Sequence, residues 1–182
     1  MPATEHDDRR DARLAVVDEH IRLENRHDLD GIMATFGTAA RYDDEAWDGR
    51  YTGRDGVRAY YQELLRAMPD LQIEVLRRYM TEAAVVVEVI IRGHHRGPWR
   101  GLPATGRALH FPLCGIYTFD DDNRLAGERI YYDRATVLRQ LGILHEPDSV
   151  AGRLGVVLMH PLTMARLIGR AMLRAGRKQD SA

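Results

Sequence analysis

The chain contains very little cysteine, almost no lysine and no long hydrophobic run. The first and the last of these shortages each exclude a class of protein. Cys114 is the only cysteine, which excludes an internal disulfide and a cysteine-rich zinc site. It lies within an apolar run, so we expect a buried, unreactive thiol. No apolar stretch approaches the ~20 residues that cross a bilayer. The charged N-terminus lacks the apolar core of a signal peptide, so a cytoplasmic protein is expected.

Charge and length set further bounds. The formal net charge of the 182 residues is -1 at pH 7, so there is no overall field to attract nucleic acid, and we expect no nucleic-acid partner. Lys178 is the only lysine, and arginine supplies almost all of the positive charge. A hydrophobic fraction of 45% is enough for a real core. The length predicts one domain with an extension.

The spacing of apolar residues changes once along the chain. Helical spacing predicts helices over 10–26, 29–36 and 56–68, with Asp28 as the N-cap of the second helix. After Pro69 the period becomes that of strands, predicted over 71–75, 83–91, 109–119 and 124–132. The almost continuously apolar segment 83–91 is expected to be covered on both faces, whereas 48–53 is interpreted as a loop. Helices followed by antiparallel strands predict an α+β domain with its helices on one face of a curved sheet.

A second change in composition occurs near residues 146–148, and it divides the chain into a domain over 1–145 and an extension over 146–182. The segment 150–173 is strongly amphipathic and basic, and Pro161 is expected to divide it into two helices. Such a helix can lie on a membrane surface. Docking on its own domain or on a partner subunit is the favoured interpretation.

An aspartate at the end of the last predicted strand carries the chemical interest. Strand alternation places Arg129, Tyr131 and Asp133 on one face. If that face lines a cavity, Asp133 is a base in a dry site, and its two neighbours can stabilise an enolate. The alternative is that Asp133 caps the helix that follows by accepting its free N–H groups. The sequence leaves both interpretations open.

Four segments resemble a known family. They are NRHDLDGI at 25–32, MPDL at 68–71, GHHRGPWRGLPATG at 93–106 and DRATVLRQLG at 133–142. Together they resemble the SnoaL-like polyketide cyclase (ester cyclase) branch of the nuclear transport factor 2-like superfamily. The resemblance implies a cone-shaped barrel of N-terminal helices wrapped by a bent antiparallel sheet, with an apolar cavity, and a homodimer formed through the sheet.

The same resemblance implies a chemistry. Members with cyclase activity close a ring by an intramolecular aldol reaction, using an aspartate and neither metal nor cofactor, and Asp133 occupies the matching position. His95 matches a histidine of the family and could hold substrate or exchange a proton with Asp133, although paired histidines at a strand end are often solvated.

Five further residues are candidates for substrate binding. Tyr42 and Trp47 follow the second helix, and Trp99 lies in the loop expected at the cavity mouth, where it either covers a flat substrate or anchors the loop. Arg129 and Tyr131 share the face of Asp133, and Arg129 would make the cavity more polar or suited to an anionic substrate. The carboxylates of residues 43 and 44 are adjacent on a strand and point apart, so they form no acid/base dyad.

These observations predict a cofactor-free acid/base enzyme for a small, largely apolar carbonyl compound. Aldol cyclisation of a polyketide-like ester is the first candidate, and isomerisation or dehydration next to a carbonyl are related candidates. The alternative is a non-catalytic module of the same fold that binds a lipid or another small molecule.

Overall fold

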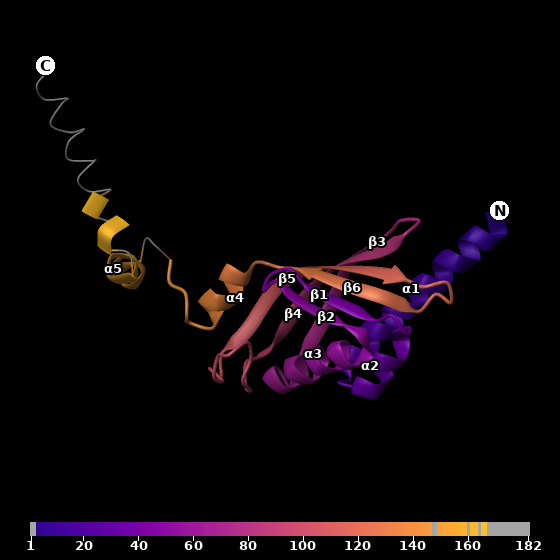
Figure 1. The fold of residues 1–182 in the computed structure, drawn as a ribbon, viewed down its shortest axis with the longest axis horizontal. Coiled ribbons are helices and arrows are strands. Elements are labelled where there is room, and N and C mark those ends of the chain that lie inside the picture. The colour runs from indigo at the N-terminus through magenta and orange to yellow at the C-terminus, as the bar shows by residue number, and fades with distance from the viewer. Residues whose placement is uncertain (1–2, 147–148, 160, 164, 167–182) are drawn as a thin grey trace, which may run out of the picture. The chain divides into compact units, whose positions relative to one another are not determined.

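The structure is a computed structural model that describes residues 3–146, 149–159, 161–163 and 165–166. The chain divides into two compact units, and the boundary in the sequence lies between Leu141 and Gly142. The first unit contains helices and a single sheet, so the predicted α+β class is confirmed (Figure 1).

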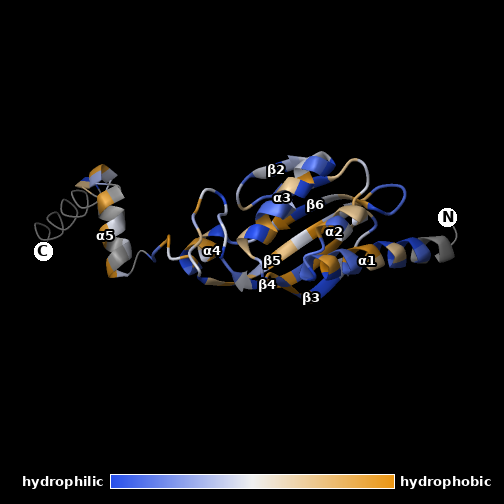
Figure 2. Cartoon of the chain, turned by 90° about the horizontal axis from the view of Figure 1, so that it is seen from below, coloured by the Kyte–Doolittle hydropathy of each residue, from blue (hydrophilic) through white to orange (hydrophobic). Residues whose placement is uncertain are grey.

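Three helices precede most of the sheet: α1 (Ala3–Asn25), α2 (Leu29–Thr35) and α3 (Gly53–Ala67). Asp28 is the N-cap of α2 as predicted, and its side chain accepts a hydrogen bond from the Gly31 N–H at 2.9 Å. Hydrophobic and hydrophilic residues alternate along α1 and α3 (Figure 2), because each helix buries one side. Both helices pack on the inner face of the sheet, α1 against β3 and β4, and α3 against β1 and β2.

The sheet has six strands in the order β2-β1-β6-β5-β4-β3. Their bounds are β1 (Arg41–Asp44), β2 (Gly49–Thr52), β3 (Gln72–Met80), β4 (Ala84–His94), β5 (Ala108–Phe119) and β6 (Leu125–Tyr131). All neighbours are antiparallel except β1 and β6, which run parallel. The sequence analysis missed the β1–β2 hairpin, because two strands of four residues are too short to display a period.

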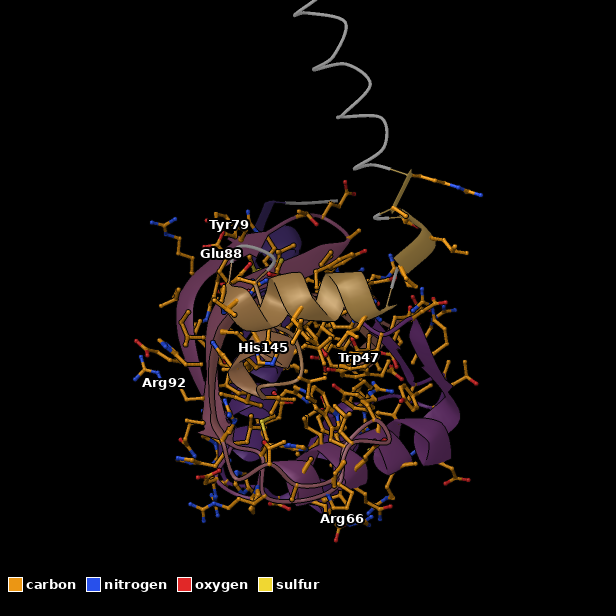
Figure 3. All side chains as sticks on the ribbon, turned by 90° about the vertical axis from the view of Figure 1, so that its left-hand side faces the viewer. Trp47, Arg66, Tyr79, Glu88, Arg92 and His145 are labelled. Carbon is orange, nitrogen blue, oxygen red and sulfur yellow. The ribbon has the colours of Figure 1, made fainter. Side chains whose placement is uncertain are left out.

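Strand β4 corrects one expectation. Its residues alternate between buried and half-buried along most of its length, so it is not covered on both faces. Helices α1 and α3 lie on the inner face, and the outer face carries polar pairs such as Tyr79 with Glu88 and Arg92 with Glu74. Figure 3 shows Tyr79, Glu88 and Arg92 on that outer side, whereas Trp47 lies on the inner side of the sheet.

The loop between β4 and β5 docks on the end of α3. The backbone N–H groups of Arg96 and Gly97 both donate to the carbonyl of Ala67, at 2.8 and 3.1 Å. A Cβ atom on Gly97 would lie 2.2 Å from the Arg66 carbonyl oxygen, so only glycine permits this approach.

The second unit includes the helix α5 (Val150–Met159). Val150, Leu154 and Leu158 are largely exposed, at the spacing of one helix face. No helix among the described residues is long and apolar enough to cross a membrane. Much of the predicted second helix, from residue 167 onward, lies outside the described residues, and docking of the extension stays a prediction.

Helix α4 (Arg134–Gln140) gives a first testable consequence. The Asp133 carboxylate accepts hydrogen bonds from the Ala135 N–H at 2.8 Å and from the Thr136 hydroxyl at 2.6 Å. We expect Asp133→Ala to lower the free energy of unfolding by about 1 kcal/mol, because an N-cap is lost. Urea denaturation measures this change. The matched control is Asp133→Asn, since asparagine caps about as well as aspartate; an equal loss in both variants would contradict a capping role.

Candidate active site

A cavity lies between the helices and the inner face of the sheet. Most of its wall is aliphatic or aromatic, with residues from α3, β3, β4, β5 and β6. About 540 Å³ is free of protein atoms, part of it open to solvent, and the centre of a water molecule can occupy about 40 Å³ of it. The side chains with polar atoms in the wall are Glu24, Tyr42, Tyr60, Tyr117, Glu128 and Tyr132. An apolar pocket with a few convergent polar groups is the usual form of a small-molecule site.

The pleat of β6 decides which residues reach this cavity. Glu128, Ile130 and Tyr132 line it, so the face carrying Arg129 and Tyr131 points outward. This outcome is the reverse of the arrangement that the catalytic interpretation of Asp133 requires. The reason is that successive side chains of a strand point to opposite faces of the sheet, so the neighbours of a residue that faces the cavity face away from it.

Helix α1 supplies two ionisable groups on its buried side. His20 and Glu24 are one helical turn apart, and both are almost fully buried. They share this side with Val17 and Ile21, which belong to the core. Burial of two ionisable groups among apolar residues is costly unless they have partners.

The partners come from α2, α3 and β6. The His20 Nε2 lies 2.9 Å from the Tyr61 hydroxyl and 3.3 Å from the Glu128 Oε2. The Tyr61 hydroxyl donates to the same Glu128 oxygen at 2.7 Å. The His20 Nδ1 lies 2.7 Å from the Thr35 hydroxyl oxygen, and that hydroxyl donates to the Ile32 carbonyl at 2.7 Å.

These hydrogen bonds define the protonation of His20. The Thr35 and Tyr61 hydroxyls each give their single proton to another acceptor, so each can only accept from the imidazole. Both ring nitrogens of His20 therefore carry a proton. Burial alone would lower the pKa of His20, but the nearby Glu24 and Glu128 outweigh it and raise the pKa. The raised pKa favours the imidazolium form of His20, which lies 3.3 Å from the Glu128 Oε2.

Glu24 is the second carboxyl group of the cluster, and its state differs. Burial raises the pKa of Glu24 to about 8; His20 opposes this rise and Glu128 adds to it. At neutral pH Glu24 is therefore a neutral acid. Two carboxyl groups in different environments at one apolar cavity can take separate acid and base roles, and the raised pKa of Glu24 makes it the acid of the pair.

The distances between the ligand atoms of this cluster would also suit a metal ion. One ligand atom from each of His20, Glu24 and Glu128 lies within 4.8 Å of the others. The Tyr61 hydroxyl, however, is hydrogen-bonded to both His20 and Glu128, and the protons on the imidazole occupy the lone pairs that a metal would need. The geometry in this structure fits a proton-holding cluster.

Tyrosines surround the two carboxyl groups. Tyr42, a predicted substrate-binding residue, is buried, lines the cavity and stacks on Tyr60 with 3.9 Å between ring centroids. Strand register places Tyr42 beside Glu128. Burial raises the pKa of Tyr42, Tyr60 and Tyr117 well above the usual phenol value, so all three stay protonated as hydrogen-bond donors.

Asp133 and His95, the two predicted catalytic residues, are not brought together. Asp133 lies at the surface with its side chain 59% exposed, and it is absent from the cavity wall. Its hydrogen bond from Thr136 lowers its pKa, which makes it a weaker base than a free aspartate. The capping interpretation describes its position.

His95 is fully buried rather than solvated. The backbone N–H of Thr105 donates to its Nδ1 at 3.3 Å, so the proton of the neutral ring is on Nε2, which has no hydrogen-bond partner in the described structure. Burial lowers the pKa of His95. The ring packs against Trp99, with 6.3 Å between centroids.

The other predicted binding residues also lie off the cavity wall. Trp99 is buried and packs edge-to-face on Trp47 with 5.6 Å between centroids, so it anchors the loop, as one of its two interpretations held. Arg129 pairs on the outer face with Asp43 and Glu45. Tyr131 is 43% exposed on the same outer face.

The sequence analysis missed His20, Glu24 and Glu128 as site residues. A signal was present: residues 17, 20, 21 and 24 have the spacing of one helix face, and two of these four are ionisable. Glu128 shares its strand face with Ile130 and Tyr132. Polar residues that interrupt an apolar face need buried partners. The sequence analysis could therefore have predicted that the polar residues of α1 and of β6 contact one another.

Comparison with known proteins supports the fold and the family. AclR from Streptomyces galilaeus is 26% identical, with a TM-score of 0.65 over 75% of this chain and 99% of that chain. TsrD from Streptomyces laurentii is 22% identical, with a TM-score of 0.65 over 74% and 98% of the two chains. IdmH from Streptomyces antibioticus is 20% identical, with a TM-score of 0.60 over 71% and 98%.

A search among curated proteins finds no significant match. The model of a protein family, described as SnoaL-like polyketide cyclase, matches residues 14–141. This range runs from the middle of α1 to just beyond the end of α4, and it contains the cavity and every residue of the buried cluster. The chain therefore belongs to the SnoaL-like polyketide cyclase family.

Proposed function

We propose that the protein is an acid/base enzyme that closes a ring in a small, largely apolar carbonyl compound by an intramolecular aldol reaction. Glu128 is the base and Glu24 is the acid. The observation that carries the proposal is that two buried carboxyl groups, Glu24 and Glu128, lie side by side in the wall of an apolar cavity, and burial raises the pKa of Glu24 to about 8. Family membership supports a cyclase-type role.

The steps balance without a co-reactant. Glu128 takes a proton from the carbon next to a carbonyl group, and the electron pair of the broken C–H bond enters the enolate. The enolate carbon forms a C–C bond with a second carbonyl carbon of the same molecule, and the proton of Glu24 goes to the oxygen of that carbonyl. One proton then returns from Glu128 to Glu24, and Tyr61 lies against both. The product is an isomer of the substrate.

The environment favours each step. The mostly apolar wall leaves little room for water, which strengthens the base and the hydrogen bonds to a developing oxyanion. The phenols at the cavity are protonated donors for the enolate oxygen. His20 and the Tyr61 hydroxyl supply Glu128 with hydrogen-bond partners in an otherwise apolar site.

The first test uses proton abstraction, which requires no knowledge of the natural substrate. Purified protein is incubated in deuterium oxide with β-tetralone, a small apolar ketone, and loss of its α-proton signal is followed by NMR. We expect Glu128→Gln to slow exchange by ~10²–10⁴-fold, the usual contribution of a general base. Asp133→Asn is the control and keeps the wild-type exchange rate, because Asp133 does not reach the cavity. Exchange that depends on Asp133 and not on Glu128 would contradict the assignment; a cavity that binds β-tetralone without accelerating exchange would indicate a binding module.

The second test concerns pH. Because Glu24 gives its proton to the oxygen of the second carbonyl, we expect ring-closing activity to fall as pH rises through about 8, by ~tenfold per pH unit above that value. In Glu24→Gln this fall in activity with rising pH disappears, together with most of the activity that depends on the acid. The same fall in both proteins would show that another group is the acid.

Stability should follow pH in the same sense. The native state keeps a proton on Glu24 up to about pH 8, whereas the unfolded chain loses it near the ordinary glutamate pKa of 4.5. The resulting stabilisation is complete below the lower value and is lost as pH rises towards the higher one. We expect the free energy of unfolding to decline across this window, and to decline less in Glu24→Gln; His20 contributes in the same direction, so some dependence remains. An unchanged pH dependence in the variant would contradict the raised pKa.

The proposal includes no metal or cofactor, so exchange of β-tetralone should proceed equally with and without EDTA. Loss of activity with EDTA, restored by a divalent ion, would assign the cluster to metal binding instead. The expected homodimer and cytoplasmic location stay predictions.

A further inference from the structure

A second polar cluster lies beside the cavity and takes no part in the steps above. It consists of Asp44, Trp47, Arg100 and Tyr132. The Arg100 Nη2 donates to the Asp44 Oδ2 at 2.7 Å, and the Tyr132 hydroxyl lies 3.4 Å from the same oxygen. Asp44 is fully buried, and the Arg100 side chain is only 13% exposed.

Strand geometry aims Asp44 at the cavity side of the sheet. Tyr42 lines the cavity, and Asp44 is two residues further along β1, on the same face. Asp43, between them, faces outward and pairs with arginines. Tyr132 belongs to both the cavity wall and the cluster, so the cluster adjoins the cavity.

Three polar atoms of this cluster make no hydrogen bond of ordinary geometry, and of these only the Trp47 Nε1 interacts weakly with the Tyr132 hydroxyl. They are the Asp44 Oδ1, the Trp47 Nε1 and the Arg100 Nε, and they make up three of the four buried side-chain atoms without a hydrogen bond among the described residues. The three residues are neighbours. The Arg100 guanidinium lies 6.0 Å from the centroid of the Trp47 ring, and the backbone N–H of Trp47 donates to the backbone carbonyl of Asp44 at 3.3 Å. Buried polar atoms without partners are rare and costly, so three in one cluster indicate a group that this structure does not contain.

The types of these atoms select the chemistry of that group. The Trp47 and Arg100 atoms are N–H donors, and the free Asp44 oxygen is an acceptor. An anion would be repelled by Asp44, an ammonium could not accept from the two N–H groups, and a carbonyl could not donate to the carboxylate. A hydroxyl group both accepts and donates, and its neutrality suits the Asp44–Arg100 ion pair, which has no net charge.

We propose that Asp44, Trp47 and Arg100 form a subsite that binds a hydroxyl group of the substrate and thereby positions the reacting carbon against Glu128. The inference rests on the proposed function for the identity of the reacting end. Strand register pairs Tyr42 with Glu128, and Asp44 is two residues beyond, so the two carboxylate-bearing positions are roughly 8 Å apart at the backbone, from the usual rise and strand spacing.

Binding of two matched probes tests the subsite without an assay of turnover. β-Naphthol carries a hydroxyl group, and β-methylnaphthalene carries a methyl group in its place. The chain has only two tryptophans, so two indole N–H signals are expected by NMR, and Trp47→Phe identifies one by its disappearance. We expect β-naphthol to shift the Trp47 indole proton downfield, β-methylnaphthalene to leave it near its free position, and the Trp99 signal to respond equally to both.

Affinity gives the second readout. Trp47→Phe keeps an aromatic ring and removes one donor, so its affinity for β-naphthol should fall about fivefold, the effect of one neutral hydrogen bond, with no change for β-methylnaphthalene. Equal responses to the two probes, or binding of both without a selective shift because a water molecule retains the subsite, would overturn the subsite alone. Failure of both probes to bind would overturn the subsite and the proposed function together, whereas a selective shift in a protein that does not exchange β-tetralone would leave the subsite and overturn the chemistry.

Discussion

The ion pair between His20 and Glu128, bridged by Tyr61, is the interaction on which the rest of this domain depends. It joins α1, α3 and β6, and thus ties the helices to the middle of the sheet. Removing one partner of such a pair leaves an unpaired buried charge, at a cost of ~3–5 kcal/mol. The rings of Phe36, Tyr61 and Tyr117 surround the imidazole at 5.4–5.9 Å between centroids, so the surrounding core excludes water from the pair. An apolar core alone would have sufficed for stability; the pair gives the cavity its chemistry.

The sheet separates two kinds of polar chemistry by its pleat. Asp43 and Asp44 are adjacent and both buried, yet Asp43 meets the exposed arginines of the outer face, while Asp44 meets Arg100 and a phenol on the inner face. Burial raises the pKa of Asp44 despite Arg100. The two faces thus differ in dielectric environment more than in composition. Neighbouring carboxylates acquire distinct properties because the backbone between them turns their side chains apart.

Much of the fold was predictable from the sequence, and the site was not. Helices and long strands have enough residues to display a period, and Asp28 at a helix start is a local signal, so these predictions were confirmed. The short hairpin β1–β2 has no measurable period. The placement of Asp133 depended on which face of β6 turns inward, and alternation alone cannot decide between two faces. The pairing of His20 with Glu128 needs the parallel register of β1 with β6 and the packing of α1, which are properties of the whole domain.

The two carboxyl groups at the cavity come from distant parts of the sequence. Glu24 belongs to the first helix and Glu128 to the last strand of the sheet, and contacts between such distant positions form only after the intervening loop entropy has been overcome. A chain in which α1 is not yet packed on the sheet therefore contains neither the pair of carboxyl groups nor the complete cavity wall. The same long-range contacts that complete the core bring the two groups together.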